Sequence, residues 1–152
     1  RLPKPDKKRF RVEELVNRVK MLYLSFENSE HVKLQVSIQP PDLELTADEN
    51  LISQVLLNLL KNALEAIAKQ PDGRIQIIAR LSDKQRTEIS VVDNGPGIPD
   101  EIIEQVFVPF FTTREKGSGI GLSLSRQIMR LHGGSLKLIS APGKKTQAIL
   151  EF

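Results

Sequence analysis

Two asparagines, Asn58 and Asn62, are the first residues whose type and spacing suggest chemistry. They lie in a segment that is predicted to form a long amphipathic helix, with Asp48 as its N-cap and an end near Gln70. Residues four positions apart lie one above the other on a helix, so both amide oxygens could face a hard cation such as Mg²⁺. The pair could equally mark the polar edge of the helix, and both interpretations stay open at this point.

A second candidate is the segment DNGPGIP, residues 93–99, which follows an apolar strand expected over residues 87–92. A carboxylate at the end of that strand, Asp93, could accept a hydrogen bond from an exocyclic amino group. Gly95 and Gly97 would let the backbone and a ligand approach closely. An ordinary turn favours the same residue types, which is the alternative interpretation.

Glycines also dominate the segment GSGIG, residues 117–121, which runs into a helix expected over residues 120–131. Exposed backbone N–H groups at the positive end of a helix form a natural phosphate site. The segment matches neither a Walker A loop nor a dinucleotide fingerprint, because the required flanking residues and the preceding strand are missing. A flexible loop that enters a helix would have a similar composition.

Between these glycine segments lies FVPFFTTREK, residues 107–116, which holds three of the six phenylalanines. It belongs to a long loop over residues 94–118, with one helical turn expected after Pro99. Hydrophobic anchors in such a loop suggest a lid that packs down in one state. Docking of the loop onto the core is the simpler alternative.

The remaining elements follow from the periodicity of apolar residues, and together they predict an α+β fold with helices on one face of a mixed sheet. A helix is expected over residues 12–26, a hairpin of two strands over 74–81 and 87–92, and further strands over 32–38, 135–140 and 146–152.

Composition and charge exclude several classes of protein. The chain has 152 residues, no cysteine and two histidines, which excludes a disulfide framework, a cysteine-based zinc site and a histidine-rich metal site. Residues 1–12 carry a net charge of +5 while the rest carries −2, so the body shows no nucleic-acid footprint. Residues 1–9 are predicted to be a linker from a missing upstream segment, and a phosphate-binding arm is the alternative. Residues 10–152 are predicted to form one domain.

Four of these segments occur in a fixed order: NLLKNALEA (58–66), DNGPGIP (93–99), FVPFFTTR (107–114) and GSGIGLSLS (117–125). In this order and spacing the chain closely resembles the ATP-binding catalytic domain of sensor histidine kinases. That family belongs to the superfamily of gyrase-type topoisomerases, MutL-type repair proteins and heat-shock chaperones. The resemblance covers about residues 10–152. It implies a Bergerat-type two-layer α/β sandwich with about three helices on one sheet face and a long ATP lid.

The resemblance also implies roles for individual residues. Asn62 would coordinate Mg²⁺, Asn58 would lie beside the phosphates, and Asp93 would accept from the adenine amino group. Gly97 would line the base pocket, and Gly117, Gly119 and Gly121 would shape the phosphate end of the lid. Four further residues are implied to contact the nucleotide: Gly95, Phe107, Thr113 and Leu122.

One position departs from the family pattern. Many members carry a lysine three residues after the magnesium-binding asparagine, whereas this chain has Glu65 there. Transfer of a phosphoryl group needs a cation on the transferring group, and Arg114 or Lys116 could supply it. The candidate catalytic residues are therefore Asn58, Arg114 and Lys116.

Hydrolytic members of the superfamily place a glutamate four residues before the magnesium ligand, where this chain has Asn58. An amide cannot act as a general base, so phosphoryl transfer to a protein is favoured over transfer to water. A nucleotide-gated interaction module and a serine kinase are the alternatives. Neither His31 nor His132 has the surroundings of a phosphoacceptor, and both are expected to be surface or capping residues.

The resemblance finally implies partners. ATP and Mg²⁺ are the expected cofactors, and a histidine on an upstream dimerisation domain is the expected acceptor. A response regulator would be reached through the full-length kinase. We expect a cytoplasmic domain that makes no contact with nucleic acid and no direct contact with a membrane, although other regions could anchor the whole protein in the inner membrane.

Overall fold

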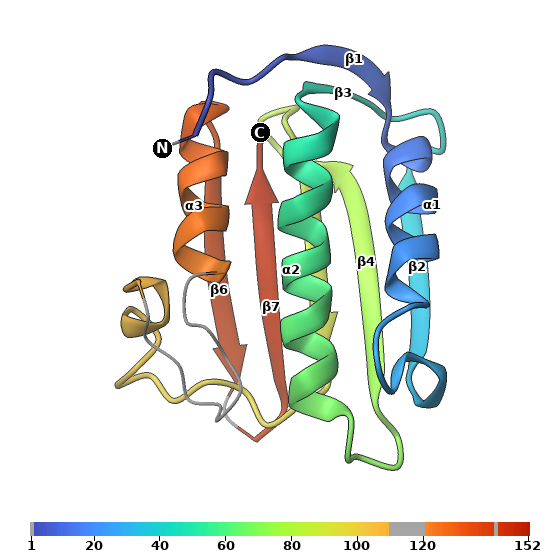
Figure 1. Ribbon diagram of the computed structural model, residues 1–152, viewed down its shortest axis with the longest axis vertical. Helices are drawn as coiled ribbons and strands as arrows, with labels where there is room; N and C mark the ends of the chain where they lie inside the picture. The colour runs from blue at the N-terminus through green and yellow to red at the C-terminus, as the bar shows by residue number, and fades with distance from the viewer. Residues whose placement is uncertain (1, 110–120, 142) are drawn as a thin grey trace.

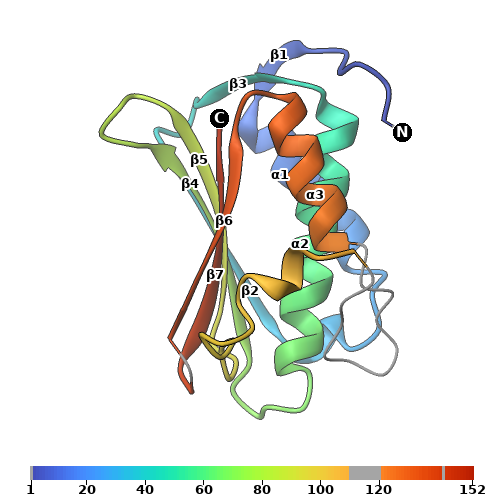
Figure 2. The ribbon, with the colours of Figure 1, turned by 90° about the vertical axis from the view of Figure 1, so that its left-hand side faces the viewer.

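The computed structural model describes residues 2–109, 121–141 and 143–152. These residues form two layers, a five-stranded sheet and a layer of helices packed on one of its faces (Figures 1 and 2). The helices are α1 (Val12–Tyr23), α2 (Glu49–Ile67) and α3 (Gly121–Leu131), with short 3₁₀ turns η1 (Ser29–His31) and η2 (Gln105–Phe107). The predicted α+β sandwich with a mixed sheet is confirmed.

The large sheet has the strand order β2-β4-β5-β7-β6. Its strands are β2 (Lys33–Gln39), β4 (Arg74–Leu81), β5 (Thr87–Asp93), β6 (Ser135–Ala141) and β7 (Lys145–Glu151). The β2–β4 pair is parallel and the other neighbours are antiparallel. Because side chains alternate along a strand, one face of the sheet supplies apolar residues to the helices. The opposite face has no helix over it in the described part of the chain (Figure 2).

Helix α2 lies across the middle of the sheet and forms the centre of the core (Figure 1). Ile52, Leu56 and Leu60 on this helix are fully buried, as the apolar periodicity of the segment predicts. The helix begins where predicted, because Asp48 Oδ1 accepts the Leu51 backbone N–H at 3.1 Å and so caps the first turn. A central helix fixed in this way provides a rigid base for polar side chains along its edge.

A second, two-stranded sheet was not anticipated from the sequence. Strand β1 (Lys8–Arg11) pairs antiparallel with β3 (Glu44–Ala47), and the Phe10 side chain is buried beneath the pair. The prolines and the run of basic residues before it conceal this strand, since only one of its four side chains is apolar. Two of the nine residues predicted as linker, Lys8 and Arg9, thus lie in a strand.

The predicted helix over residues 12–26 ends earlier, at Tyr23. The backbone N–H groups of Ser25 and Phe26 bond to carbonyls three residues back, and the Ser25 hydroxyl donates to the Leu22 carbonyl at 2.6 Å. These bonds close the helix with a tight turn. Among the described residues, no helix combines the length and the apolar character that crossing a membrane requires.

Candidate active site

Asn58 lies where α2 and α3 touch. Its Nδ2 group donates to the Ser125 hydroxyl at 3.2 Å, and the side chain is half-buried. Gly121, the first residue of α3, packs directly on this amide, so that a Cβ there would lie 2.7 Å from Nδ2 and 2.8 Å from Cγ of Asn58. A side chain at position 121 would therefore force the Asn58 amide out of its present position, and glycine lets the two helices approach without that shift.

Asn62 follows one turn later on the same stripe of α2 and is half-buried. Its amide oxygen is a suitable Mg²⁺ ligand. The described residues contain no cluster of three or more acidic or histidine side chains that could hold a metal ion. A magnesium ion at Asn62 would therefore depend on oxygens of a bound ligand, as phosphate-bound Mg²⁺ does.

At the far end of the same helix, α2 meets the end of β5. Asp93, the last residue of β5, is only 6% exposed, and its Oδ1 accepts the Gly95 backbone N–H at 2.8 Å. A Cβ at Gly95 would lie 2.7 Å from that oxygen and 3.0 Å from Cγ2 of Ile67 on α2. The glycine therefore allows the chain to turn closely over a buried carboxylate, which such a hydrogen bond stabilises.

Asn94 holds this turn in place, and sequence reasoning gave it no role. Its Oδ1 accepts the Arg74 backbone N–H at 2.8 Å, and its Nδ2 donates to the Asp72 carbonyl at 2.9 Å. The Gln70 side chain in turn donates to the Asn94 carbonyl at 3.1 Å. These bonds tie the glycine segment to the turn that joins α2 and β4. The signal in the sequence was the tendency of asparagine to bond to nearby backbone groups.

The segment beyond Asn94 is fixed against the edge of β6. Gly97 has a φ angle of 78°, a conformation that glycine adopts without strain. The next residue, Ile98, donates its backbone N–H to the Ser140 hydroxyl at 2.6 Å. Ser140 is a contributor that nothing in the sequence singled out, because a serine near the end of a strand has many ordinary roles.

These contacts place two chemically different ends along one stripe of α2. Asn58, Asn62 and Ala66 follow one another at intervals of four residues, so about 12 Å of helix separates the first from the last. Gly121 packs on Asn58, and Gly95 packs close to Ala66, where an added Cβ would lie 3.4 Å from the Ala66 Cβ. A carboxylate acceptor thus occupies one end and a helix N-terminus, which favours anions, occupies the other. An elongated ligand with an amino-bearing ring and a phosphate tail matches this order.

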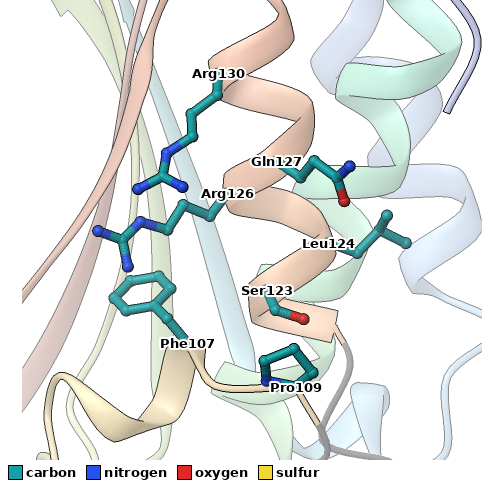
Figure 3. Close-up of a pocket in the computed structure, with 7 residues that line it drawn as sticks. All are labelled: Phe107, Pro109, Ser123, Leu124, Arg126, Gln127 and Arg130. Atoms are coloured by element: carbon teal, nitrogen blue, oxygen red, sulfur yellow. The ribbon is translucent and has the colours of Figure 1, made fainter. Parts of the chain in front are cut away.

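A groove borders α3 on the side of η2 (Figure 3). The Arg126 guanidinium lies 4.5 Å from the centre of the Phe107 ring, a distance typical of a cation–π contact. The groove has a volume of about 560 Å³, and Arg130 extends toward the same side. The residues that line it are Phe107, Pro109, Ser123, Leu124, Arg126, Gln127 and Arg130.

The structure brings together part of the predicted site. Leu122 is partly buried against the core beside Gly121, and Phe107 packs against the core as an anchor of the long loop. The expected helical turn after Pro99 is the 3₁₀ turn η2. Five predicted residues lie outside the described residues: Thr113, Arg114, Lys116, Gly117 and Gly119.

Both histidines have the ordinary settings that the sequence suggested. His31 is exposed and lies 3.3 Å from a Glu30 carboxylate oxygen. His132 follows the last residue of α3, and its Nδ1 lies 2.8 Å from the Ile128 carbonyl, where it caps the helix. Ser125, the partner of Asn58, was missed, although a polar residue on the buried side of an amphipathic helix is a usable signal.

Comparison with known proteins gives a consistent result. Residues 47–152 match the family model described as histidine kinase-, DNA gyrase B- and HSP90-like ATPase. The chain is similar to the C4-dicarboxylate transport sensor protein DctB of Rhizobium meliloti, with 37% identity over 116 residues, covering 76% of this chain and 18% of that protein. It is also similar to the sensor histidine kinase ZraS of Salmonella typhimurium, with 38% identity, covering 76% and 24% of the two chains. The chain thus spans less than a quarter of the length of these two relatives.

Solved structures show the same similarity in three dimensions. The catalytic domain of histidine kinase ThkA, in a nucleotide-free form, superimposes with a TM-score of 0.84 at 32% identity, covering 97% of this chain and 95% of that one. A structure of histidine kinase ThkA in complex with response regulator protein TrrA matches with a TM-score of 0.81 at 31% identity, covering 97% of this chain and 42% of that one.

Proposed function

Because the chain belongs to the histidine kinase-, DNA gyrase B- and HSP90-like ATPase family, as an ATP-binding catalytic domain of the histidine kinase type, we propose that it transfers the γ-phosphoryl group of Mg-ATP to a histidine on an upstream helical hairpin. The observation that carries the proposal is the arrangement along α2. The Asn58 amide meets the start of α3 at one end, and the Asp93 carboxylate lies at the other.

The residues divide the binding of ATP between them. Asp93 accepts a hydrogen bond from the adenine amino group, and Gly95 and Gly97 leave room for the ring beside it. The N-terminus of α3 at Gly121 stabilises the phosphates through its exposed N–H groups. Asn62 would hold Mg²⁺, which neutralises charge on the phosphates during transfer. These groups position the terminal phosphoryl group for attack by an imidazole nitrogen, after which ADP leaves.

The identity of residue 58 favours transfer to protein over transfer to water. Its amide is engaged with the Ser125 hydroxyl at 3.2 Å, and an amide has no basic site that could take a proton from water. The enzyme therefore lacks, at this position, the general base that would activate water. The cation on the transferring group is assigned to Arg114 or Lys116, since Glu65 carries the opposite charge.

We further propose that the acceptor hairpin docks in the groove along α3. An acceptor must reach the phosphate end of the site, and the groove begins in the first turn of α3, close to Gly121 (Figure 3). Leu124 lines it and is 37% exposed, which suits contact with an apolar helix face. Leu124→Arg should reduce transfer without reducing ATP affinity. Leu81→Arg is the matched control, because Leu81 is 39% exposed and lies on β4 at a distance from α3.

The experiment that tests the proposal uses radiolabelled ATP with this chain, with a histidine-bearing hairpin, and with both. We expect acid-labile label on the hairpin only when both polypeptides and Mg²⁺ are present. Label on His31 or His132 of this chain would contradict the proposal, and acid-stable label on a hydroxyl side chain would indicate a serine kinase. Tight binding of Mg-ATP without transfer to any hairpin would instead support a nucleotide-gated interaction module.

A further inference from the structure

Asp48, the N-cap of α2, contacts three separate parts of the chain. Its Oδ1 accepts the Leu51 N–H at 3.1 Å within α2, and its Oδ2 accepts the Asp6 N–H at 2.9 Å from the segment that leads into the fold. Its own backbone N–H donates to His132 Nε2 at 3.0 Å, just beyond the last residue of α3. One residue therefore links the entering segment, the central helix and the end of α3.

The ring of His132 is fixed by two bonds. Nδ1 lies 2.8 Å from the Ile128 carbonyl, and since a carbonyl oxygen can only accept, Nδ1 must carry the proton. Nε2 is then the acceptor that the Asp48 N–H requires. Both nitrogens are satisfied by the neutral Nδ1–H tautomer, so the ring fastens the end of α3 to the N-cap of α2.

The other end of α3 lies at the phosphate end of the proposed site. The helix has 11 residues, about 16 Å in length, and begins at Gly121 against Asn58. A short helix moves as a rigid body, so a displacement at His132 also displaces Gly121 and the first-turn residues that line the groove. In Figure 1 the N-terminal end of the chain lies on the side of α3, and the chain then runs from there to β1.

We propose that Asp48 and His132 are positioning residues that couple the segment before β1 to the orientation of α3, and through α3 to phosphoryl transfer. The proposal rests on the proposed kinase function, in which α3 borders both the phosphates and the docked acceptor. In this proposal, the hydrogen bond from the Asp6 backbone N–H to Asp48 transmits the position of the entering segment to α3. Loss of this link should affect transfer from a tethered acceptor more than ATP binding.

Asp6 provides a matched pair of variants. Its side chain is exposed and 4.0 Å from the Lys8 amine, while the link to Asp48 is made by its backbone N–H. Asp6→Ala therefore retains the link, whereas Asp6→Pro removes the donor. With a histidine-bearing hairpin joined to the N-terminus, we expect Asp6→Pro to slow transfer about tenfold, within the usual range for coupled sites. Asp6→Ala should retain the wild-type rate, and the ATP dissociation constant should change less than twofold in both.

His132 provides a second, independent pair. His132→Gln places an acceptor near the position of Nε2 and should restore coupling to Asp48. His132→Asn can still donate to the Ile128 carbonyl but is too short to reach the Asp48 N–H. We expect slow tethered transfer in His132→Asn and rescue in His132→Gln. The coupling would be overturned if the wild type transfers the phosphoryl group to the tethered hairpin and the two variants of each pair do so at equal rates.

Hydrogen exchange tests the same link without relying on kinase activity. If α3 is held through Asp48 and His132, its backbone amides should exchange several-fold faster in Asp6→Pro than in Asp6→Ala, while β5 remains equally protected. Equal exchange of α3 in the two variants would overturn the proposal even if transfer is observed. Faster exchange of α3 together with an inactive wild type would support the link and contradict the kinase function instead.

Discussion

The close contact between α2 and α3 at Gly121 and Asn58, the end of the proposed site that would hold the phosphates, can be tested with Gly121→Ala. The added methyl group would lie 2.7 Å from Nδ2 and 2.8 Å from Cγ of Asn58. The Asn58 side chain therefore has to move to another rotamer, which breaks its 3.2 Å bond to Ser125. The substitution thus displaces a residue of the proposed active site without altering its chemistry.

The magnitude follows from the groups involved. Loss of the Asn58–Ser125 hydrogen bond costs about 1 kcal/mol, and a strained rotamer costs about 1 kcal/mol more. Alanine in place of glycine in a helix stabilises by about 0.5 to 1 kcal/mol. Gly121→Ala should therefore destabilise the fold by about 1 kcal/mol. In an Asn58→Ala background the collision is absent, and the same change should stabilise the fold by about 0.5 to 1 kcal/mol.

The assay is urea unfolding of the wild type, the two single variants and the double variant, followed by circular dichroism. The expected interaction energy is about 2 kcal/mol, seen as a reversal in the direction of the midpoint shift with an unchanged slope. A titration with Mg-ATP should show weaker binding for Gly121→Ala than for the wild type. Additivity of the two substitutions within about 0.5 kcal/mol would refute the reasoning, because it would mean that the two residues do not collide.

Three further predictions concern single residues. Asn62→Ala should weaken Mg-ATP binding far more than Mg-free nucleotide binding, since Asn62 is the proposed oxygen ligand of Mg²⁺, and equal losses in the two titrations would contradict that role. Asp93→Ala should cost about 1.5 to 3 kcal/mol in ATP binding and erode the preference for adenine over guanine, which competition titrations measure. Burial raises the pKa of the Asp48 carboxyl, but hydrogen bonds from surrounding backbone N–H groups outweigh burial and lower this pKa below its ordinary 3.8. The Asp48 carboxylate therefore stabilises the fold at pH values above 3.8. At pH 7 the unfolding free energy of the wild type should exceed that of Asp48→Asn by roughly 1 kcal/mol. This difference should shrink as the pH falls below 3.8.

The central parts of the fold were predictable because their signals are local and repeated. Apolar residues at helical spacing predicted α2, and Asp48 marked its start correctly. Strand β1 was missed, because its pairing with β3 depends on residues about 35 positions away and on a single buried side chain, Phe10. Pairing over that distance leaves no periodic trace in a four-residue strand.

The candidate site shows the same division. Residues whose chemistry is unusual for their element, such as Asn58 and Asp93, were identified from the sequence. Their supporting partners were not, because Ser125, Ser140 and Asn94 gain a role only when distant elements meet. Asn94 illustrates this, since its hydrogen bonds to Gln70, Asp72 and Arg74 join two turns that are about 20 residues apart in the sequence.

The identity of residue 58 allows a last prediction about the choice between kinase and ATPase. Asn58→Asp is nearly isosteric, so it preserves the contact with Gly121, and the Ser125 hydroxyl can donate to a carboxylate instead of accepting from an amide. The variant would therefore place a basic group where the wild type has none, at the cost of repulsion between the carboxylate and the phosphates. We expect weaker ATP binding but a several-fold higher ratio of released phosphate to phosphohistidine, because general base catalysis accelerates attack by water. Asn58→Ala is the control that removes the amide without adding a base. An unchanged ratio in Asn58→Asp, together with an intact fold, would show that the side chain at position 58 does not determine whether water or a histidine receives the phosphoryl group.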